Sequence, residues 1–214
     1  MNLALFDFDG TITFKDSFAP FMRMAAHPST SARRIRLLPL IAGYKAGIVS
    51  ASTTRARIAS FVFRGRQESE IRELGASYAR QVLPGTVRPK AIERIAWHKA
   101  RGDAVVVVSA ALDVYLAEWC RLASLDTLCT ELEVIDGVLT GRYRNGDCAG
   151  PEKSRRIRQR YRLEDFAEIY AYGDTSEDSE MLSLAHHRYF RWQEQSGDLP
   201  RVRRADHVDQ DPER

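Results

Sequence analysis

Two carboxylates, Asp7 and Asp9, stand two residues apart at the end of the apolar run 3–8. Apolar residues on both faces of this run are typical of a central strand in a parallel sheet. In a regular strand the two carboxylates would point to opposite faces, so the chain must twist at its end for both to serve one site. Gly10 provides the permissive backbone for that bend. Thr11 then offers a hydroxyl, and the amides that follow can donate to phosphate oxygens.

Polar residues also follow two further predicted strands. The valine-rich run 104–108 ends at Ser109, and the run 168–172 is followed by Gly173 and Asp174. Because the site of a parallel α/β sheet lies beyond the carboxyl ends of its strands, we expect these side chains to meet in one crevice. Taken singly, each has a plainer interpretation as a turn or helix cap. Their joint occurrence favours a site.

Phosphoryl transfer is the chemistry that such a set could perform. It needs a nucleophile, a proton donor for the leaving alkoxide and strong neutralisation of a charged transition state. A carboxylate alone would repel a phosphate dianion. Mg²⁺, a hard cation that prefers oxygen ligands, removes that objection by bridging the carboxylates and the phosphate.

Four short motifs make this interpretation more specific. They are DFDGT at 7–11, VVVVSA at 105–110, GPEK at 150–153 and GDTSEDSEML at 173–182. In this order and spacing they resemble the four motifs of the haloacid dehalogenase-like (HAD) phosphatases, and the resemblance spans roughly residues 3 to 192.

The resemblance implies a role for each of these residues. Asp7 would attack phosphorus and become the aspartyl phosphate, and Asp9 would protonate the leaving group and then activate water. Lys153 would neutralise the nucleophile and the transferring group. The implied Mg²⁺ site comprises Asp7, the backbone carbonyl of Asp9, Asp174 and, directly or through water, Asp178. The implied phosphate-binding residues are Gly10, Thr11, Ser109 and Ala110.

Helical and strand patterns alternate along the rest of the chain. We expect helices at 19–26, 31–49, 52–63, 68–82, 88–101, 113–123, 151–161 and 179–185, strands at 104–108, 127–130, 168–172 and 188–192, and a hairpin at 132–143 turning at 136–137. This pattern predicts an α/β fold with a doubly wound, Rossmann-like parallel sheet. We expect a core of residues 1–15 and 85–192, an inserted helical cap of the C1 type at 16–84 with a hinge at Pro84-Gly85, and a polar, mobile tail at 193–214.

Within the family, the chain resembles subfamily IB, which contains phosphoserine phosphatase. The hairpin text EVIDGVLTGRY is similar to bacterial members of this subfamily. Two features depart from phosphoserine phosphatase: Ser109-Ala110-Ala111 replaces Ser-Gly-Gly, and Asp16 stands where that family has a glutamate for the substrate amine. Asp16 and Arg55 are candidates for substrate contact, with hinge or surface roles as the alternatives.

The segments KDSFAPFMR, RLLPLIAGYKAG and HHRYFRW also resemble phosphatidylglycerophosphatase C, a short capped member of the same subfamily. The second segment combines an apolar face with basic residues. It could lie on an anionic membrane surface at the cytoplasmic side, or it could pack within the cap with its basic side chains reaching solvent. Together these resemblances leave two substrate classes: a small phosphorylated metabolite or a phospholipid head-group phosphate.

The composition argues against several other classes of protein. The chain has 214 residues, a net charge of +3 and a pI of about 8.8, and it shows no domain-wide basic stripe that would indicate nucleic-acid binding. Three widely spaced cysteines predict reduced thiols in a cytoplasmic protein. We expect no signal peptide and no membrane span, because the longest apolar run, 37–44, is too short.

Other functions that use the same residues stay open at this stage. Dehalogenation needs neither Mg²⁺ nor an acid at Asp9, so Asp9 argues against it. A phosphotransferase or mutase would use the same aspartyl phosphate. A non-catalytic binding module would be expected to lack one of Asp7, Asp9, Lys153 and Asp174, and all are present. The sequence contains no feature that predicts the oligomeric state.

Overall fold

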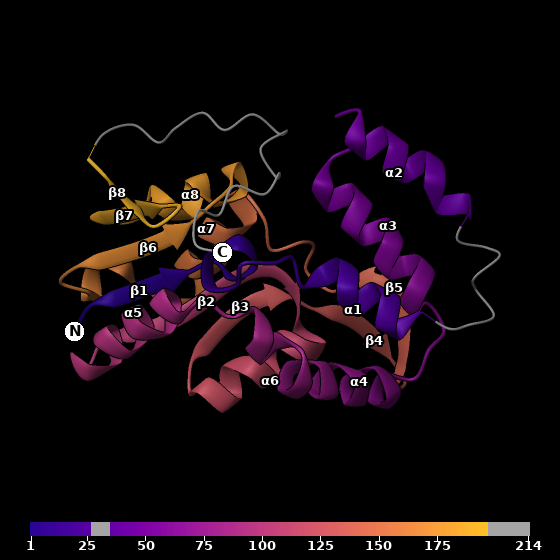
Figure 1. Ribbon diagram of the computed structural model, residues 1–214, viewed down its shortest axis with the longest axis horizontal. Coiled ribbons are helices and arrows are strands. Elements are labelled where there is room, and N and C mark those ends of the chain that lie inside the picture. Colours follow the sequence, from indigo (N-terminus) through magenta and orange to yellow (C-terminus); the bar gives the residue numbers. More distant parts are fainter. Residues whose placement is uncertain (27–34, 197–214) are drawn as a thin grey trace.

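A mixed sheet lies on one side of the molecule, at the left in Figure 1. The computed structural model describes residues 1–26 and 35–196. The strand order is β3-β2-β1-β6-β7-β8; the first five strands run parallel, and β8 pairs antiparallel at the edge. This confirms the predicted α/β fold. The strands of this sheet are β1 (Leu3–Phe6), β2 (Ala104–Leu112), β3 (Asp126–Thr130), β6 (Ile169–Gly173), β7 (His187–Phe190) and β8 (Gln193–Gln195).

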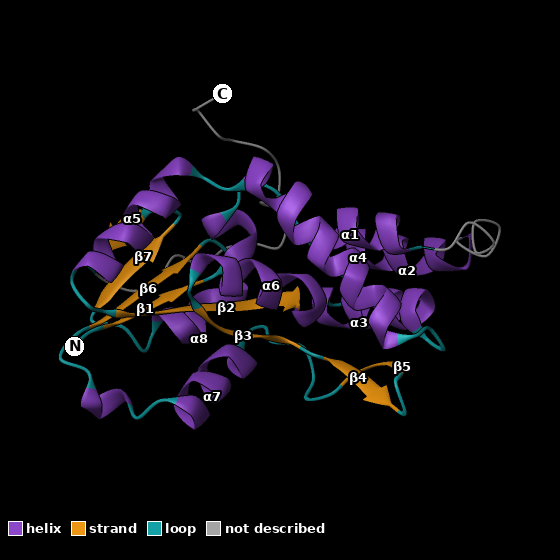
Figure 2. Cartoon of the chain, turned by 90° about the horizontal axis from the view of Figure 1, so that it is seen from below, coloured by secondary structure: helices purple, strands orange, loops and turns teal. Residues whose placement is uncertain are grey.

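Helices cover both faces of the sheet (Figure 2). Alternate residues of the central strands enter two apolar layers, because successive side chains of a strand point to opposite faces. Phe6 and Val107 join the layer that includes the helices α5 and α6, and Leu5 and Val108 join the layer that includes α7 and α8. The bounds of these helices are α5 (Pro89–Ala100), α6 (Asp113–Ala123), α7 (Pro151–Arg160) and α8 (Ser179–Leu182).

In the described part of the chain, four α-helices between β1 and α5 gather beyond the carboxyl ends of the strands (Figures 1 and 2). They are α1 (Phe18–Ala25), α2 (Leu38–Lys45), α3 (Ala51–Phe63) and α4 (Glu68–Gln81). Three of them follow the predicted bounds closely. The helix expected at 31–49 is shorter: α2 ends at Lys45, before the positive φ of Gly47, and residues 31–34 lie outside the described part.

A small hairpin joins this helical layer to the sheet domain. It comprises β4 (Leu132–Ile135) and β5 (Val138–Tyr143), with the predicted turn at Asp136 and Gly137. Its backbone pairs with the loop between α3 and α4: Gly65 donates to the carbonyl of Leu139 and Leu139 to that of Arg66, both at 2.8 Å. The α3–α4 end of the helical layer is therefore attached to the hairpin through backbone hydrogen bonds.

A second attachment is the close packing of α4 on α6. A Cβ added to Gly75 would lie 2.0 Å from the backbone oxygen of Val114, so the two helices approach here as only glycine allows. Other boundaries differ from expectation as well: α8 ends at Leu182 and not at 185, and β7 ends at Phe190 and not at 192. β2 continues past Ser109 to Leu112, and Gln193–Gln195, expected at the start of the tail, form β8. Residues 197–214 lie outside the described part. None of the described helices has the length and apolar character needed to cross a membrane.

Candidate active site

The turn after β1 brings the DFDGT motif (7–11) into contact with the GDTSEDSEML motif (173–182). Gly10 has a φ of 88°, which confirms the bend expected after the two aspartates. A Cβ at this position would lie 2.2 Å from Oδ2 of Asp174, so glycine is required for space as well as for backbone freedom. Thr11 donates from Oγ1 to Oδ1 of Asp174 at 3.3 Å. The ends of β1 and β6 therefore meet as predicted, and Thr11 orients a carboxylate in this structure.

Lys153 links two buried carboxylates. Its Nζ lies 2.5 Å from Oδ1 of Asp7 and 2.6 Å from Oδ1 of Asp178, and its side chain is only 2% exposed. Although burial alone lowers the pKa of this ammonium, Asp178 and Asp7 raise it above its usual value. Lys153 therefore stays charged and fixes one oxygen of Asp7.

Asp178 organises the loop after β6 from its other oxygen. Oδ2 accepts hydrogen bonds from the backbone N–H groups of Asp174 and Thr175, each at 3.0 Å, and from the hydroxyl of Thr175. Both oxygens of Asp178 are thus already engaged. This favours a supporting role for Asp178 beside the more open carboxylates of Asp7 and Asp174.

The three carboxylates form a set that fits a divalent cation. One oxygen from each of Asp7, Asp174 and Asp178 lies within 4.8 Å of the others. With all three ionised and Lys153 protonated, the set carries a surplus of two negative charges. Burial raises the pKa of Asp174 to about 7, and Asp178 adds to the rise. An all-oxygen set with this excess of negative charge is suited to Mg²⁺.

Asp9 is not part of this set, and its carboxylate accepts hydrogen bonds from the residue that precedes α1. Ser17 donates to its carboxylate from the backbone N–H at 2.9 Å and from Oγ at 3.0 Å. The Ser17 hydroxyl also lies 3.1 Å from the hydroxyl of Tyr115 on α6, and Tyr78 on α4 donates to the Ser17 carbonyl at 3.0 Å. Burial, chiefly, and then the nearby Asp16 raise the pKa of Asp9 well above its usual value.

Sequence reasoning missed this network around Ser17. Ser17 directly follows the candidate Asp16, which was the one available signal. Tyr115 is 98 residues away and Tyr78 is 61 residues away, and neither belongs to a motif. Tertiary packing alone brings them together.

Ser109 lies at the expected place on β2 and is buried. Its Oγ accepts a hydrogen bond from the backbone N–H of Ala111 at 3.1 Å. This hydrogen bond lies within β2, and Ala110 between the two residues is partly exposed. The predicted role of Ser109 and Ala110 in phosphate binding stays a prediction.

The two candidates for substrate contact have protein partners in this structure. Arg55 on α3 lies 2.7 Å from Asp147 and 3.0 Å from Glu177, so its guanidinium joins the helical layer to two loops of the sheet domain. Asp147 also accepts from Thr130, a partner that sequence reasoning missed. The exposed Asp16 accepts from the backbone N–H of Ala19 at 2.9 Å and thereby caps the start of α1.

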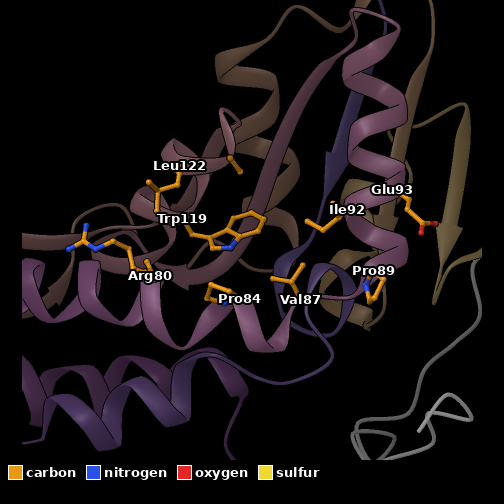
Figure 3. Close-up of a pocket in the computed structure, with 10 residues that line it drawn as sticks. Arg80, Pro84, Val87, Pro89, Ile92, Glu93, Trp119 and Leu122 are labelled. Atoms are coloured by element: carbon orange, nitrogen blue, oxygen red, sulfur yellow. The ribbon is translucent and has the colours of Figure 1, made fainter.

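An apolar hollow lies elsewhere, between α4, α5, α6 and the segment that follows α4 (Figure 3). Its volume is about 770 Å³, and its lining is mainly apolar, including Pro84, Val87, Ile92, Trp119 and Leu122. None of the carboxylates described above lines it. This hollow therefore takes no part in the chemistry assigned to the carboxylates.

Comparison with known proteins decides the family. The family model for haloacid dehalogenase-like hydrolases matches residues 4–183. The chain belongs to the haloacid dehalogenase-like hydrolases. The resemblance found in the sequence motifs is therefore confirmed, and this HAD hydrolase carries its motif carboxylates where the strands β1 and β6 end.

Individual relatives agree with this assignment. Protein CicA of Caulobacter vibrioides is 32% identical over 191 residues, covering 88% of this chain and 85% of that protein. A Bordetella pertussis Tohama I structure, described as a protein of unknown function, has a TM-score of 0.75 at 25% identity and covers 88% of this chain and 89% of its own. A substrate-bound phosphoserine phosphatase has a TM-score of 0.64 at 20% identity, covering 88% and 85% of the two chains. This last likeness is one of fold.

Proposed function

We propose that this HAD hydrolase is a Mg²⁺-dependent phosphomonoesterase that works through an aspartyl phosphate on Asp7. The supporting observation is the buried ion pair of Lys153 with Asp7 and Asp178, next to the Asp174 carboxylate. An ammonium in this place lets a carboxylate approach a phosphate dianion, because it offsets the charge of the nucleophile.

The first half-reaction uses both motif aspartates. Lys153 holds Oδ1 of Asp7, which leaves Oδ2 to attack phosphorus as the ester P–O bond breaks. Asp9, whose raised pKa favours the protonated form, donates its proton to the leaving alkoxide. Mg²⁺ held by Asp7, the Asp9 carbonyl and Asp174, with support from Asp178, would supply charge neutralisation to the transferring group.

The second half-reaction returns the site to its starting state. Asp9, now ionised, takes a proton from water, and the resulting hydroxide attacks the phosphorus of the acyl phosphate. Inorganic phosphate leaves, and the Asp7 carboxylate is regenerated. Transfer to a second hydroxyl instead of water would make the enzyme a phosphotransferase or mutase, and product analysis distinguishes the two.

We propose that residues 16–84 act as a cap that contacts the leaving group of the substrate. The substrate class is a small phosphorylated metabolite or a phospholipid head-group phosphate, and phosphoserine stays an alternative. The three cysteines are free and buried, which is compatible with the reducing cytoplasm.

Turnover of p-nitrophenyl phosphate with Mg²⁺, with EDTA, and with EDTA followed by excess Mg²⁺ tests this function. We expect phosphate release that EDTA abolishes and Mg²⁺ restores. A binding module would release no phosphate under any of the three conditions. Asp7→Asn is expected to be inactive in all of them.

A further inference from the structure

An apolar helix at the edge of the helical layer is left almost uncovered. Leu40 is the one buried residue of α2. Leu38 is 58% exposed, Ile41 37% and Tyr44 39%. The flanking residues Ile35 and Ile48 are 67% and 83% exposed. A helix that is apolar around its circumference is ordinarily buried, so this exposure indicates a partner.

The charged residues along the chain on either side of this helix are all basic. Residues 17–67 contain no aspartate or glutamate. Arg36 and Lys45 flank the apolar side chains and are exposed, and the described part of the chain gives neither an ion pair. Leu38, Ile41 and Lys45 share one side of α2, because residues three, four and seven apart lie on the same face of a helix.

We propose that this outward face of α2, with Ile35 and Ile48 beside it, docks on a membrane surface rich in anionic lipid. The apolar side chains would enter the boundary between head groups and acyl chains, and Arg36 and Lys45 would contact the lipid phosphates. At eight residues, α2 lies along such a surface and does not span it. A nucleic-acid backbone offers no apolar layer in which exposed isoleucine and leucine side chains could be buried. A lipid surface does, so we favour it over another polyanion.

Flotation with lipid vesicles tests the proposal independently of catalysis. We expect the full chain to bind vesicles of phosphatidylcholine containing a third phosphatidylglycerol, and to bind pure phosphatidylcholine far more weakly. Added salt should weaken the binding, because it screens the charges. The double variant Leu38→Asp/Ile41→Asp should bind at least about tenfold more weakly, and Arg36→Gln and Lys45→Gln each about fivefold more weakly.

Leu122→Asp on α6 is the matched control, since Leu122 is also apolar and 52% exposed. It should bind vesicles as the wild type does. All variants should hydrolyse p-nitrophenyl phosphate at the wild-type rate, so a failure of docking is read separately from a failure of the proposed function. Absent vesicle binding, equal binding to neutral and anionic vesicles, equal loss in Leu122→Asp, or binding of single-stranded RNA in place of vesicles would overturn the proposal.

Discussion

Asp9 and Ser17 are joined by two hydrogen bonds, from the Ser17 backbone N–H at 2.9 Å and from its hydroxyl at 3.0 Å. Ser17 stands at the start of α1, and its hydroxyl meets Tyr115 on α6. The direction of the Asp9 carboxylate therefore depends on how the helical layer sits against the sheet domain. If Asp9 is the proton donor, Ser17 is its positioning residue.

Removal of the Ser17 hydroxyl should reduce the rate of hydrolysis most for substrates with poor leaving groups. An alkyl phosphate needs a correctly placed acid, whereas p-nitrophenolate leaves with little help. We expect Ser17→Ala to slow hydrolysis of β-glycerophosphate by about 10- to 100-fold and that of p-nitrophenyl phosphate by less than about threefold. Tyr115→Phe should act in the same direction, but more weakly.

The ratio of the two rates is the decisive quantity for Ser17. Ser17→Thr keeps a hydroxyl and should restore most of the ratio. Tyr161→Phe, which removes a distant hydroxyl bound to Asp126, should leave it unchanged. If Ser17→Ala slowed both substrates equally, the hydroxyl would have a structural role and no role in placing the acid.

Lys153→Met should remove both activity and stability. Asp7 and Asp178 would be left as buried carboxylates without their ammonium, which costs about 3–5 kcal/mol in the free energy of unfolding. Turnover should fall by at least about 10²-fold. Urea denaturation and steady-state kinetics measure the two effects. Lys99→Met, at an exposed lysine that donates one hydrogen bond to the Ala123 carbonyl, should cost less than about 1 kcal/mol and leave turnover unchanged. A fully active Lys153→Met enzyme would contradict the assigned role.

Gly75→Ala tests the packing of α4 on α6. The new Cβ would meet the backbone oxygen of Val114 at 2.0 Å, and a backbone atom cannot move aside cheaply. We expect the free energy of unfolding to fall by about 1–3 kcal/mol, despite the better helix propensity of alanine. Gly85→Ala is the matched control, because a Cβ there meets nothing within 4 Å. Equal stability of the two variants would show that the helices separate at no cost.

His98 should make stability fall as the pH is lowered. It is buried between Asp103 and the Tyr172 hydroxyl, each 2.9 Å from a ring nitrogen. Burial lowers the pKa of His98 below its ordinary value of 6.5, although Asp103 opposes the shift. The unfolded chain therefore binds this proton more readily, so stability present above about pH 6.5 is lost below it. The fall between about pH 7 and pH 5 should be smaller in His98→Gln, as measured by urea denaturation. An identical fall would contradict this.

The sequence predicted what local patterns determine. The strand ends just before Asp7 and Asp174 and the hairpin turn at Asp136 are each set by a run of neighbouring residues, whereas β2 continues past its predicted end at Ser109 to Leu112. The bend at Gly10 was predicted, but its close approach to Asp174 was not, because that contact joins residues far apart in the chain.

Long-range contacts account for what the sequence did not predict. Arg55 was a candidate for substrate contact, and its ion pair with Asp147 spans 92 residues. The hydroxyl pair of Ser17 and Tyr115 spans 98. The edge strand β8 has only three residues, too few for an alternating pattern to emerge from a polar stretch.

Trapping of the phosphoenzyme is the sharpest test of Asp7 as the nucleophile. Wild-type enzyme with Mg²⁺ and p-nitrophenyl phosphate would be quenched in acid during turnover and digested, and the peptides analysed by mass spectrometry. We expect one phosphoryl group on the peptide that contains Asp7, removed by hydroxylamine as an acyl phosphate and absent from Asp7→Asn. Turnover with the phosphoryl group on another residue, or undiminished turnover by Asp7→Asn, would contradict it.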